Sequence, residues 1–310
     1  MAILQKSAPP ISDSIEPLKA EKFLEAVSKY MEPYKGKYNY HAIFQDHLQK
    51  TDHVDAGYGQ WLQKLLEHLV KSYNLNKQAR ILDIGCGTGE LVVRMDTLGF
   101  EATGMDLHEK HLELARILAK ENNLSDTIFV LNKNKRLPFD DNSFDIVTMF
   151  SVLEHLDKLT LKWLLPELAR ICNGVIYVLV PNKLKPTDDH TGLHFVSYLP
   201  RWLAIPYIKL RGKYQYFISE SGTWDVYHRN YTKVVSVFKR YGYKVDLPPD
   251  DVIYPPLEVC PSICRIGKDF RIGNHRFFVG LPLPCKIMRR LGYPKQAFYP
   301  YLNLIFCQEK

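Results

Sequence analysis

The chain has 310 residues, of which 46% are hydrophobic and 24% are charged, as expected of a soluble globular protein with one large or two modest domains. The N-terminus lacks the apolar core of a signal peptide, and no apolar run is long enough to span a bilayer, so we expect a cytoplasmic protein. The net charge of +7 is uneven: residues 1–180 carry 21 Lys and Arg against 24 Asp and Glu (−3), whereas residues 181–310 carry 20 against 10 (+10). The excess of basic residues in the C-terminal part indicates something about the binding partner and not about the fold.

The six cysteines are scattered along the chain, and only Cys260 and Cys264 are close in sequence. That spacing, without a second pair or a histidine partner, is a poor zinc signature. We therefore expect free thiols in a reducing cytoplasm.

Residues 1–60 are predicted to form an N-terminal tail and a helical cap. Residues 1–20 are aperiodic, and apolar residues at helical spacing follow from Ala20 to Met31. A second amphipathic pattern, from Trp61 to Val70, predicts the helix that leads into the first strand. Residues 61–182 then alternate strand and helix patterns, as a parallel α/β sheet requires.

The central feature of the sequence is the stretch from Ile81 to Glu90, a short apolar run followed by glycines at positions 85, 87 and 89. This order predicts a buried strand, a tight turn and the start of a helix, which opens a doubly wound α/β unit. Glycines allow positive φ and remove Cβ atoms, so a ligand can lie against bare backbone and meet the free N–H groups of the helix. The dinucleotide fingerprint would require glycine at position 90, where Glu90 would repel a pyrophosphate.

Asp83 precedes the first glycine by two positions, and a carboxylate there suits a cofactor that carries cationic groups and no phosphate. The resulting Asp-x-Gly-x-Gly-x-Gly stretch resembles motif I of the class I S-adenosylmethionine (SAM) dependent methyltransferases. Three further motifs resemble the same family and follow in its order: Leu137-Pro138-Phe139, Ser143-Phe144-Asp145 and Leu153-Glu154-His155. The resemblance covers roughly residues 78–182 and implies a Rossmann-like α/β fold, a seven-stranded sheet flanked by helices that is mostly parallel with its last strand antiparallel.

Asp106 ends the second predicted strand, 19 positions after Gly87, where an acid is placed to accept hydrogen bonds from two ribose hydroxyls. Its alternative role is to cap the next helix. The acid that contacts adenine in many family members is replaced here by Lys133, which cannot accept a hydrogen bond, so Asn132, Asn134 or the backbone takes that role. The SAM contacts that the resemblance implies come from Asp83, Gly85, Cys86, Gly87, Gly89, Asp106, Leu107, Asn132, Asn134, Phe150 and Ser151.

Residues 183–225 are predicted to form an insertion on the substrate side, which begins with a polar stretch that contains His190 and His194. Histidine titrates in the range that a general base needs to deprotonate a hydroxyl. We take His190 and His194 as the first candidates for a catalytic base and His155 as the third. The same stretch, with Asp189, has the residue types of a metal site, and a purely structural polar loop is the other alternative. We predict no metal.

Two stretches, Phe195–Tyr214 and Phe277–Arg290, mix aromatic and aliphatic residues with Arg and Lys. This composition suits either contact with a membrane surface or an insertion that covers the substrate and packs on the core. Residues 226–310 are predicted to complete the sheet through strands at Tyr243–Asp246 and Tyr301–Cys307. A second insertion, at about 248–300, is too long for a bare connection between them.

The predicted activity is SAM-dependent methyl transfer, with O-methylation of a small-molecule, glycan or lipid-linked acceptor as the favoured chemistry. The Asn/Asp-Pro-Pro-Tyr/Phe run that is typical of N-methylation does not follow the fourth predicted strand. The alternatives are a quinone or lipid methyltransferase on the inner face of the membrane, an RNA or DNA methyltransferase, and a SAM-binding protein without transferase activity. Nucleic acid is the less favoured partner, because the basic residues alternate with large apolar ones.

Overall fold

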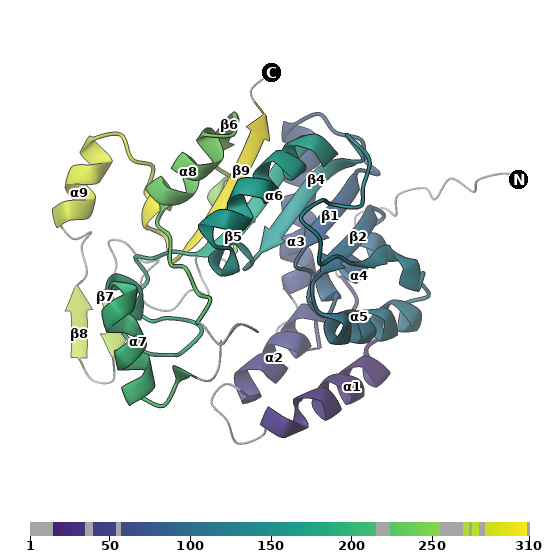
Figure 1. The fold of residues 1–310 in the computed structure, drawn as a ribbon, viewed down its shortest axis with the longest axis horizontal. Coiled ribbons are helices and arrows are strands. Elements are labelled where there is room, and N and C mark those ends of the chain that lie inside the picture. The colour runs from purple at the N-terminus through teal and green to yellow at the C-terminus, as the bar shows by residue number, and fades with distance from the viewer. Residues whose placement is uncertain are drawn as a thin grey trace, which may run out of the picture. The chain divides into compact units, whose positions relative to one another are not determined.

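The computed structural model of the chain describes residues 15–34, 40–53, 57–214, 224–254, 269–272, 275–278 and 283–308 (Figure 1). These residues divide into two compact units. The first unit holds the described residues up to Phe150 together with Lys162–Tyr177. The second unit holds Ser151–Leu161 and the described residues from Val178 onward.

Helices and strands alternate along the first unit, as the sequence predicts. Its helices are α1 (Glu21–Met31), α2 (Tyr40–Lys50), α3 (Tyr58–Ser72), α4 (Glu90–Thr97), α5 (Glu109–Glu121) and most of α6 (Lys158–Ile171). Its strands are β1 (Arg80–Ile84), β2 (Glu101–Asp106), β3 (Phe129–Leu131), β4 (Phe144–Phe150) and the first part of β5 (Cys172–Pro181). The second unit contains, in chain order, the short 3-10 helices η3 (Leu153–His155) and η4 (Val196–Tyr198), then α7 (Arg201–Leu210), α8 (Tyr231–Lys239), β6 (Tyr243–Asp246), β7 (Asp269–Ile272), β8 (His275–Phe278), α9 (Leu283–Arg290) and β9 (Tyr301–Gln308).

Seven of the strands form one sheet in the order β3-β2-β1-β4-β5-β9-β6, and β7 and β8 pair antiparallel in a separate two-stranded sheet. Strand β1 pairs in parallel with β2 and β4, and β2 pairs in parallel with β3, whereas β6 and β9 are antiparallel. This arrangement confirms the predicted Rossmann-like sheet and the predicted antiparallel strand at the C-terminus. Helices that cover a parallel sheet bury both of its faces, which explains why β1 and β5 are almost continuously buried.

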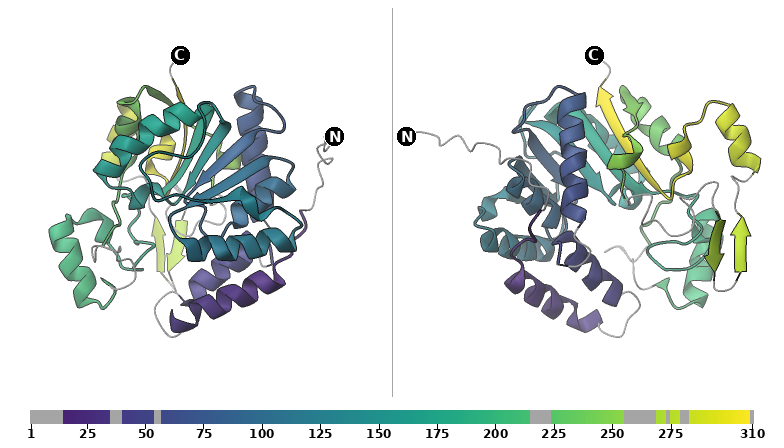
Figure 2. Two further views of the ribbon diagram at one scale, coloured as in Figure 1. Left: turned by 45° about the vertical axis from the view of Figure 1, so that its right-hand side comes forward. Right: turned by 180° about the vertical axis from the view of Figure 1, so that it is seen from behind.

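The N-terminal helices α1 and α2 pack on later helices of the same unit. Helix α1 lies beside α5, and α2 lies beside α4 (Figure 2). The carboxylate of Glu121, at the end of α5, accepts hydrogen bonds from the backbone N–H groups of Lys22 and Phe23, both at 2.8 Å. It satisfies donors that every helix start leaves unpaired, because Ala20 provides no side-chain cap for α1. Leu18 is buried too, so the described end of the predicted tail is packed. The described part of the predicted cap, α1 and α2, is therefore helical.

Buried polar contacts hold the N-terminal segment to α4. Arg94 Nη2 lies 2.6 Å from Asp52 Oδ2, and Asp52 Oδ1 accepts the backbone N–H of Tyr58 at 3.1 Å. Glu90, the first residue of α4, is hydrogen-bonded to His47. Burial would raise the pKa of the Glu90 carboxyl, but the charge and hydrogen bond of His47 lower it to about 2. The acid that follows the glycines is thus turned toward His47.

The second unit has its own apolar cluster, made by Leu193, Val196, Ala204, Ile208, Trp224 and Val226. Helix α7 places Ala204 and Ile208 in this cluster, whereas Trp202 and Leu210 are 72% and 86% exposed. Within the predicted insertion, one side of α7 therefore packs on this cluster, and the other side leaves large apolar side chains exposed to solvent. Near the C-terminus, the rings of Phe238 and Phe306 stack at 3.8 Å between α8 and β9.

Some predicted features fall outside what the structure describes. Cys260 and Cys264 lie outside the described residues, whereas Cys86, Cys172 and Cys307 form no disulfide within the described part of the chain, as expected. In the stretch Phe277–Arg290, side chains are described only from position 287 onward. Within the described part of the chain, no helix has the length and apolarity needed to cross a bilayer. The division at residues 60, 182 and 225 stays a prediction.

Candidate functional site

The glycine-rich turn joins β1 to α4 at the carboxyl edge of the strands. Its three glycines adopt positive φ, 70° at Gly85, 54° at Gly87 and 82° at Gly89, in the left-handed region that glycine occupies without strain. The backbone N–H groups of Gly85 and Cys86 both donate to the carbonyl oxygen of Met105, at 2.7 Å and 3.1 Å. The end of β2 therefore fixes the course of the turn.

Two glycines of the turn have opposite surroundings. A Cβ atom at Gly87 would meet no atom of the described residues within 4 Å, so they leave the backbone there open to a ligand. A Cβ atom at Gly89 would lie 2.6 Å from Ala115 and 2.7 Å from Phe129, closer than real contacts allow. Gly89 is therefore required for the close packing of the turn against α5 and β3.

Asp106 links the turn to the start of α5. Its Oδ2 accepts the backbone N–H of Gly87 at 2.9 Å, and its Oδ1 accepts the backbone N–H of His108 at 2.8 Å. The bond to His108, which immediately precedes α5, matches the helix-capping alternative. An ionised carboxylate accepts about four hydrogen bonds, so the two backbone bonds are compatible with the predicted contacts to ribose hydroxyls.

Asp83 is buried inside the sheet, 2% exposed, and its Oδ1 accepts the hydroxyl of Thr148 on β4 at 2.7 Å. Burial raises the pKa of the Asp83 carboxyl and nearby Asp106 raises it further, whereas the Thr148 hydrogen bond lowers it, with a result of about 7. A carboxyl group in this state gains a favourable partner when a cationic ligand group binds beside it.

The loop after β3 is shaped by Asn132. Its side-chain oxygen accepts the backbone N–H of Asn134 at 3.0 Å, and its amide nitrogen donates to the carbonyl oxygens of Asn134 and Arg136. The buried amide of Asn132 is thus used to fold the loop, whereas Asn134 is exposed. Of the two asparagines predicted to contact adenine, Asn134 is the better placed to meet a ligand.

The other residues predicted to contact SAM lie in different environments. Cys86 is buried, which raises the pKa of its thiol. Leu107, beside Asp106, is 58% exposed and presents an apolar side chain at the carboxyl edge. Phe150 lies between the rings of Trp61 and Tyr177, at centroid distances of 5.9 Å and 5.6 Å. These contacts give Phe150 a packing role in addition to the predicted one.

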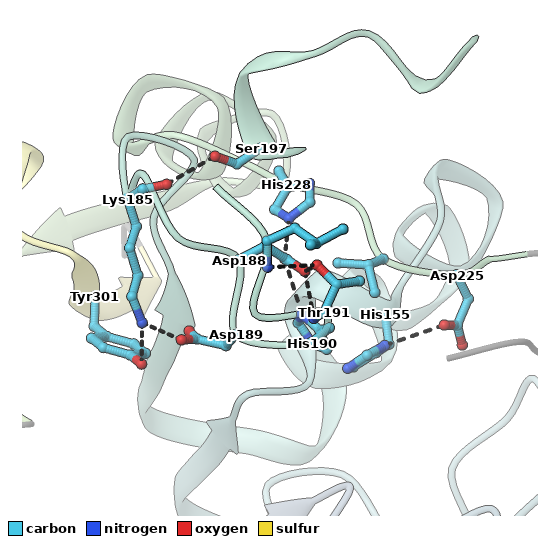
Figure 3. A network of polar contacts seen from close by, with 12 residues as sticks. His155, Lys185, Asp188, Asp189, His190, Thr191, Ser197, Asp225, His228 and Tyr301 are labelled. Atoms are coloured by element: carbon cyan, nitrogen blue, oxygen red, sulfur yellow. Dashed lines mark hydrogen bonds and ion pairs between the residues drawn. The ribbon is translucent and has the colours of Figure 1, made fainter. Parts of the chain in front are cut away.

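Asp188 organises a network of histidines in the second unit (Figure 3). Its Oδ1 lies 2.7 Å from His228 Nε2 and 3.5 Å from His190 Nδ1, and its Oδ2 accepts the backbone N–H and the hydroxyl of Thr191. Burial would raise the pKa of the Asp188 carboxyl, but the hydrogen bonds from His190 and His228 hold it well below its usual range. Burial would lower the pKa of the His190 imidazole, but Asp188 raises it.

The turn after β4 brings further ionisable groups to His190. Ser151, with a left-handed φ of 54°, follows the last residue of β4. The chain then enters η3, which carries Glu154 and His155. The rings of His155 and His190 meet edge to face, with their centroids 5.1 Å apart. Ligand-type atoms of Glu154, His155 and His190 all lie within 4.8 Å of one another. We call these three residues the Glu-His-His cluster.

His194 does not join this cluster. It is exposed, with its Nδ1 3.0 Å from the hydroxyl of Thr187. Asp189, predicted as a possible metal ligand with His190 and His194, is paired with Lys185 instead, as Figure 3 shows. Of the three histidines predicted as catalytic candidates, the structure therefore brings together His155 and His190.

Sequence reasoning missed Asp188, Asp225 and His228 as parts of this site. His228 lies 40 positions from Asp188, and nothing in a single sequence marks such a pair. Glu154 had a local signal, since it stands beside His155 in a motif that the resemblance had already identified.

Comparisons with known proteins find that part of this chain is similar to methyltransferases. The family model for a methyltransferase domain matches residues 81–174. A protein of Geobacillus sp. (strain WCH70) named as a methyltransferase is 40% identical over 96 residues, 31% of this chain and 38% of that protein. The ubiquinone biosynthesis O-methyltransferase of Rickettsia canadensis (strain McKiel) is 26% identical over 53% of this chain and 67% of its own length. A demethylmenaquinone methyltransferase of Staphylococcus epidermidis is 32% identical over 35% of this chain and 46% of its own length.

The chain thus spans between 38% and 67% of the length of these relatives. Residues 81–174 thus match a methyltransferase domain, and the glycine turn and the strand order agree with the class I SAM-dependent methyltransferase fold that the motifs predicted. The cofactor of this class is SAM. The site fits it, because Asp83 gains from a cationic partner and Gly87 leaves its backbone uncovered.

Substitutions of Gly87 and Gly89 should have different effects, the first mainly on SAM binding and the second mainly on the stability of the fold. Gly87→Ala adds a methyl group where a ligand would lie, so we expect SAM affinity to fall at least about tenfold, with about 1 kcal/mol of stability lost to positive φ. Gly89→Ala overpacks the turn against Ala115 and Phe129, so we expect a stability loss of about 1–3 kcal/mol or more. Calorimetric SAM titration and denaturant unfolding measure the two effects. Equal stability losses in both variants would contradict this assignment.

The raised pKa of Asp83 predicts that SAM binding releases protons. With a pKa of about 7, the free carboxyl is about half protonated at pH 7, and a bound cation favours ionisation. We expect roughly half a proton to be released per SAM at pH 7, and SAM affinity to rise as the pH increases through 7. Calorimetry in buffers of different ionisation enthalpy measures this release.

The matched control is Asp83→Asn, which keeps the shape and cannot ionise. Its binding heat should be independent of the buffer. A wild-type binding heat that is equally independent of the buffer would show that Asp83 is already ionised before SAM binds.

Proposed function

We propose that the protein is an O-methyltransferase that transfers the methyl group of SAM to the hydroxyl of a small-molecule or lipid-linked acceptor. The observation that carries this proposal is the histidine network of the second unit, in which Asp188 holds His190 within a buried acid-base cluster. A hydroxyl is a poor nucleophile until its proton is removed, so an enzyme that methylates oxygen benefits from such a group.

The residues divide the chemistry between them. When bound, SAM would supply an activated methyl group, whose transfer to the acceptor oxygen would turn the sulfonium into a neutral thioether. Asp188 accepts a hydrogen bond from His190 Nδ1, and a histidine held in this way presents Nε2 as its basic nitrogen. We propose that His190 takes the hydroxyl proton and that His155, whose ring contacts it, assists.

The outward side of α7 favours a lipid-linked acceptor over a soluble one. Trp202, Leu203 and Leu210 are exposed there, and Lys209 and Arg211 are exposed beside them. Aromatic and aliphatic side chains next to cations suit a membrane surface that carries anionic lipid. Two of the relatives are named for quinone methylation, and quinones carry long apolar tails, which supports the same substrate class.

The first test is a transfer assay with methyl-labelled SAM and whole-cell extract, separated into organic, aqueous and polymer fractions. We expect the label in the organic fraction. Label in the aqueous fraction alone would replace the lipid-linked acceptor by a soluble metabolite or glycan, and label in nucleic acid would overturn the proposal.

The same assay tests the base. We expect His190→Gln to lower the transfer rate by about 10²–10⁴-fold, because a general base contributes that much, with SAM affinity unchanged. The matched control is His194→Gln, in the same loop but outside the Glu-His-His cluster, and it should stay within about twofold of wild type. Equal losses in the two variants would show that the effect comes from the loop rather than from a base.

The α7 surface predicts binding to anionic vesicles. Replacing Trp202 and Leu203 by Ser removes two exposed apolar groups, so we expect sedimentation with phosphatidylglycerol-containing vesicles to fall at least about tenfold. The control is Leu159→Ser, which removes a side chain that is 74% exposed on α6. Vesicle binding that is unaffected by the α7 changes would remove the support for a lipid-linked acceptor.

A further inference from the structure

The starting point is the carboxylate of Glu154, which is 2% exposed and has no hydrogen-bond partner on either oxygen among the residues that the structure describes. A buried polar group without a partner is costly, and a buried charge is costlier still. The backbone carbonyl of the same residue is satisfied, since it accepts the N–H of Tyr227 at 2.6 Å. The backbone of Glu154 is therefore held in place, while no described residue donates a hydrogen bond to its carboxylate oxygens.

What faces this carboxylate is a pair of imidazoles. Ligand-type atoms of Glu154, His155 and His190 lie within 4.8 Å of one another. Around an ion with bonds of about 2.1 Å, ligand atoms are at most about 4.2 Å apart, so small side-chain rotations would bring all three onto one ion. Two histidines and one carboxylate form a common donor set for first-row divalent metals.

Both histidines have an acidic partner on the other side of the ring. His190 Nδ1 lies 3.5 Å from Asp188 Oδ1, and His155 Nδ1 lies 3.6 Å from Asp225 Oδ1 (Figure 3). Histidines that bind metals usually donate one ring N–H to a carboxylate or carbonyl, which fixes the tautomer and makes the other nitrogen a better ligand. The second unit supplies this outer layer for both rings.

The backbone beneath the cluster is held by Arg229. This buried guanidinium donates to the carbonyl oxygens of Leu153 and Leu156, on either side of Glu154 and His155. Its donors are therefore directed at the backbone of η3, which fixes where the side chains of the turn begin. A site whose ligands sit on a fixed turn is ordered before its ion arrives.

We propose that Glu154, His155 and His190 bind a divalent metal ion of the zinc type. Two imidazoles and one carboxylate suit Zn²⁺, Co²⁺ or Fe²⁺ better than Mg²⁺, which prefers oxygen ligands. Three protein ligands leave a position open, as in catalytic rather than structural zinc sites. On the proposed function, the open position receives the acceptor hydroxyl, whose pKa the ion lowers; with the ion bound, His190 is a ligand and water takes the proton that His190 accepts in the metal-free protein.

The test is titration of the metal-stripped full-length protein with Co²⁺, followed by its visible d–d absorption, and with Zn²⁺, followed by calorimetry. We expect one ion to bind per chain, with a Co²⁺ d–d absorption spectrum typical of nitrogen and oxygen ligands. Binding of Mg²⁺ should be weak or absent. Bound Zn²⁺ should also raise the melting temperature, because an ion that binds only the folded state stabilises it.

Glu154→Gln keeps the shape of the side chain and removes the charge, so we expect metal affinity to fall at least about 100-fold. His155→Gln, at a half-buried position, serves as a second ligand variant should the first fold poorly, with the same expected loss. The matched controls are His194→Gln and Asp189→Asn, which lie in the same loop as His190 and outside the cluster. Metal binding that is absent in wild type, or that survives both ligand variants, would overturn the proposal.

These measurements are independent of methyl transfer. A protein that binds one Zn²⁺ through Glu154 and transfers no methyl group would retain the metal site and refute the proposed function. Methyl transfer by a protein that binds no metal would refute the site and leave His190 as the base.

Discussion

The end of β2 fixes the position of the cofactor turn. The carbonyl oxygen of Met105 holds the backbone of Gly85 and Cys86, and the carboxylate of Asp106 holds that of Gly87. Because β2 is itself held in parallel register against β1, the loop between β1 and α4 has little freedom before a ligand binds. A turn that is ordered in advance loses less conformational entropy on binding, which favours affinity.

Both units bury a carboxyl group whose neighbours compensate it incompletely. Asp83 has one hydroxyl donor and a pKa near neutrality, and Glu154 receives no hydrogen bond on either oxygen from any described residue. Such groups lower stability, so their presence at a candidate site is more informative than that of a satisfied surface acid. In the first unit we predict that the missing partner is the cationic part of SAM, and in the second we assign it to a metal ion.

The loop that follows β5 shows how burial selects one residue from several alike. His190 and His194 stand four positions apart, yet His190 is buried against Asp188 while His194 faces solvent beside Thr187. Asp188 makes the difference, since its carboxylate bonds to Thr191 and His228 as well and so closes the loop around His190. The spacing of the two histidines alone carried no such distinction.

The sequence by itself determined the sheet, the glycine turn and the cofactor class. These features depend on local signals, namely apolar runs with the strand or helix period, glycines at positions of positive φ, and acids a fixed distance along the chain. Only the tertiary structure decided which ionisable groups meet. Glu154, His190 and His228 come from three segments whose contact depends on how loops pack, and loop packing follows from long-range burial that no local pattern encodes.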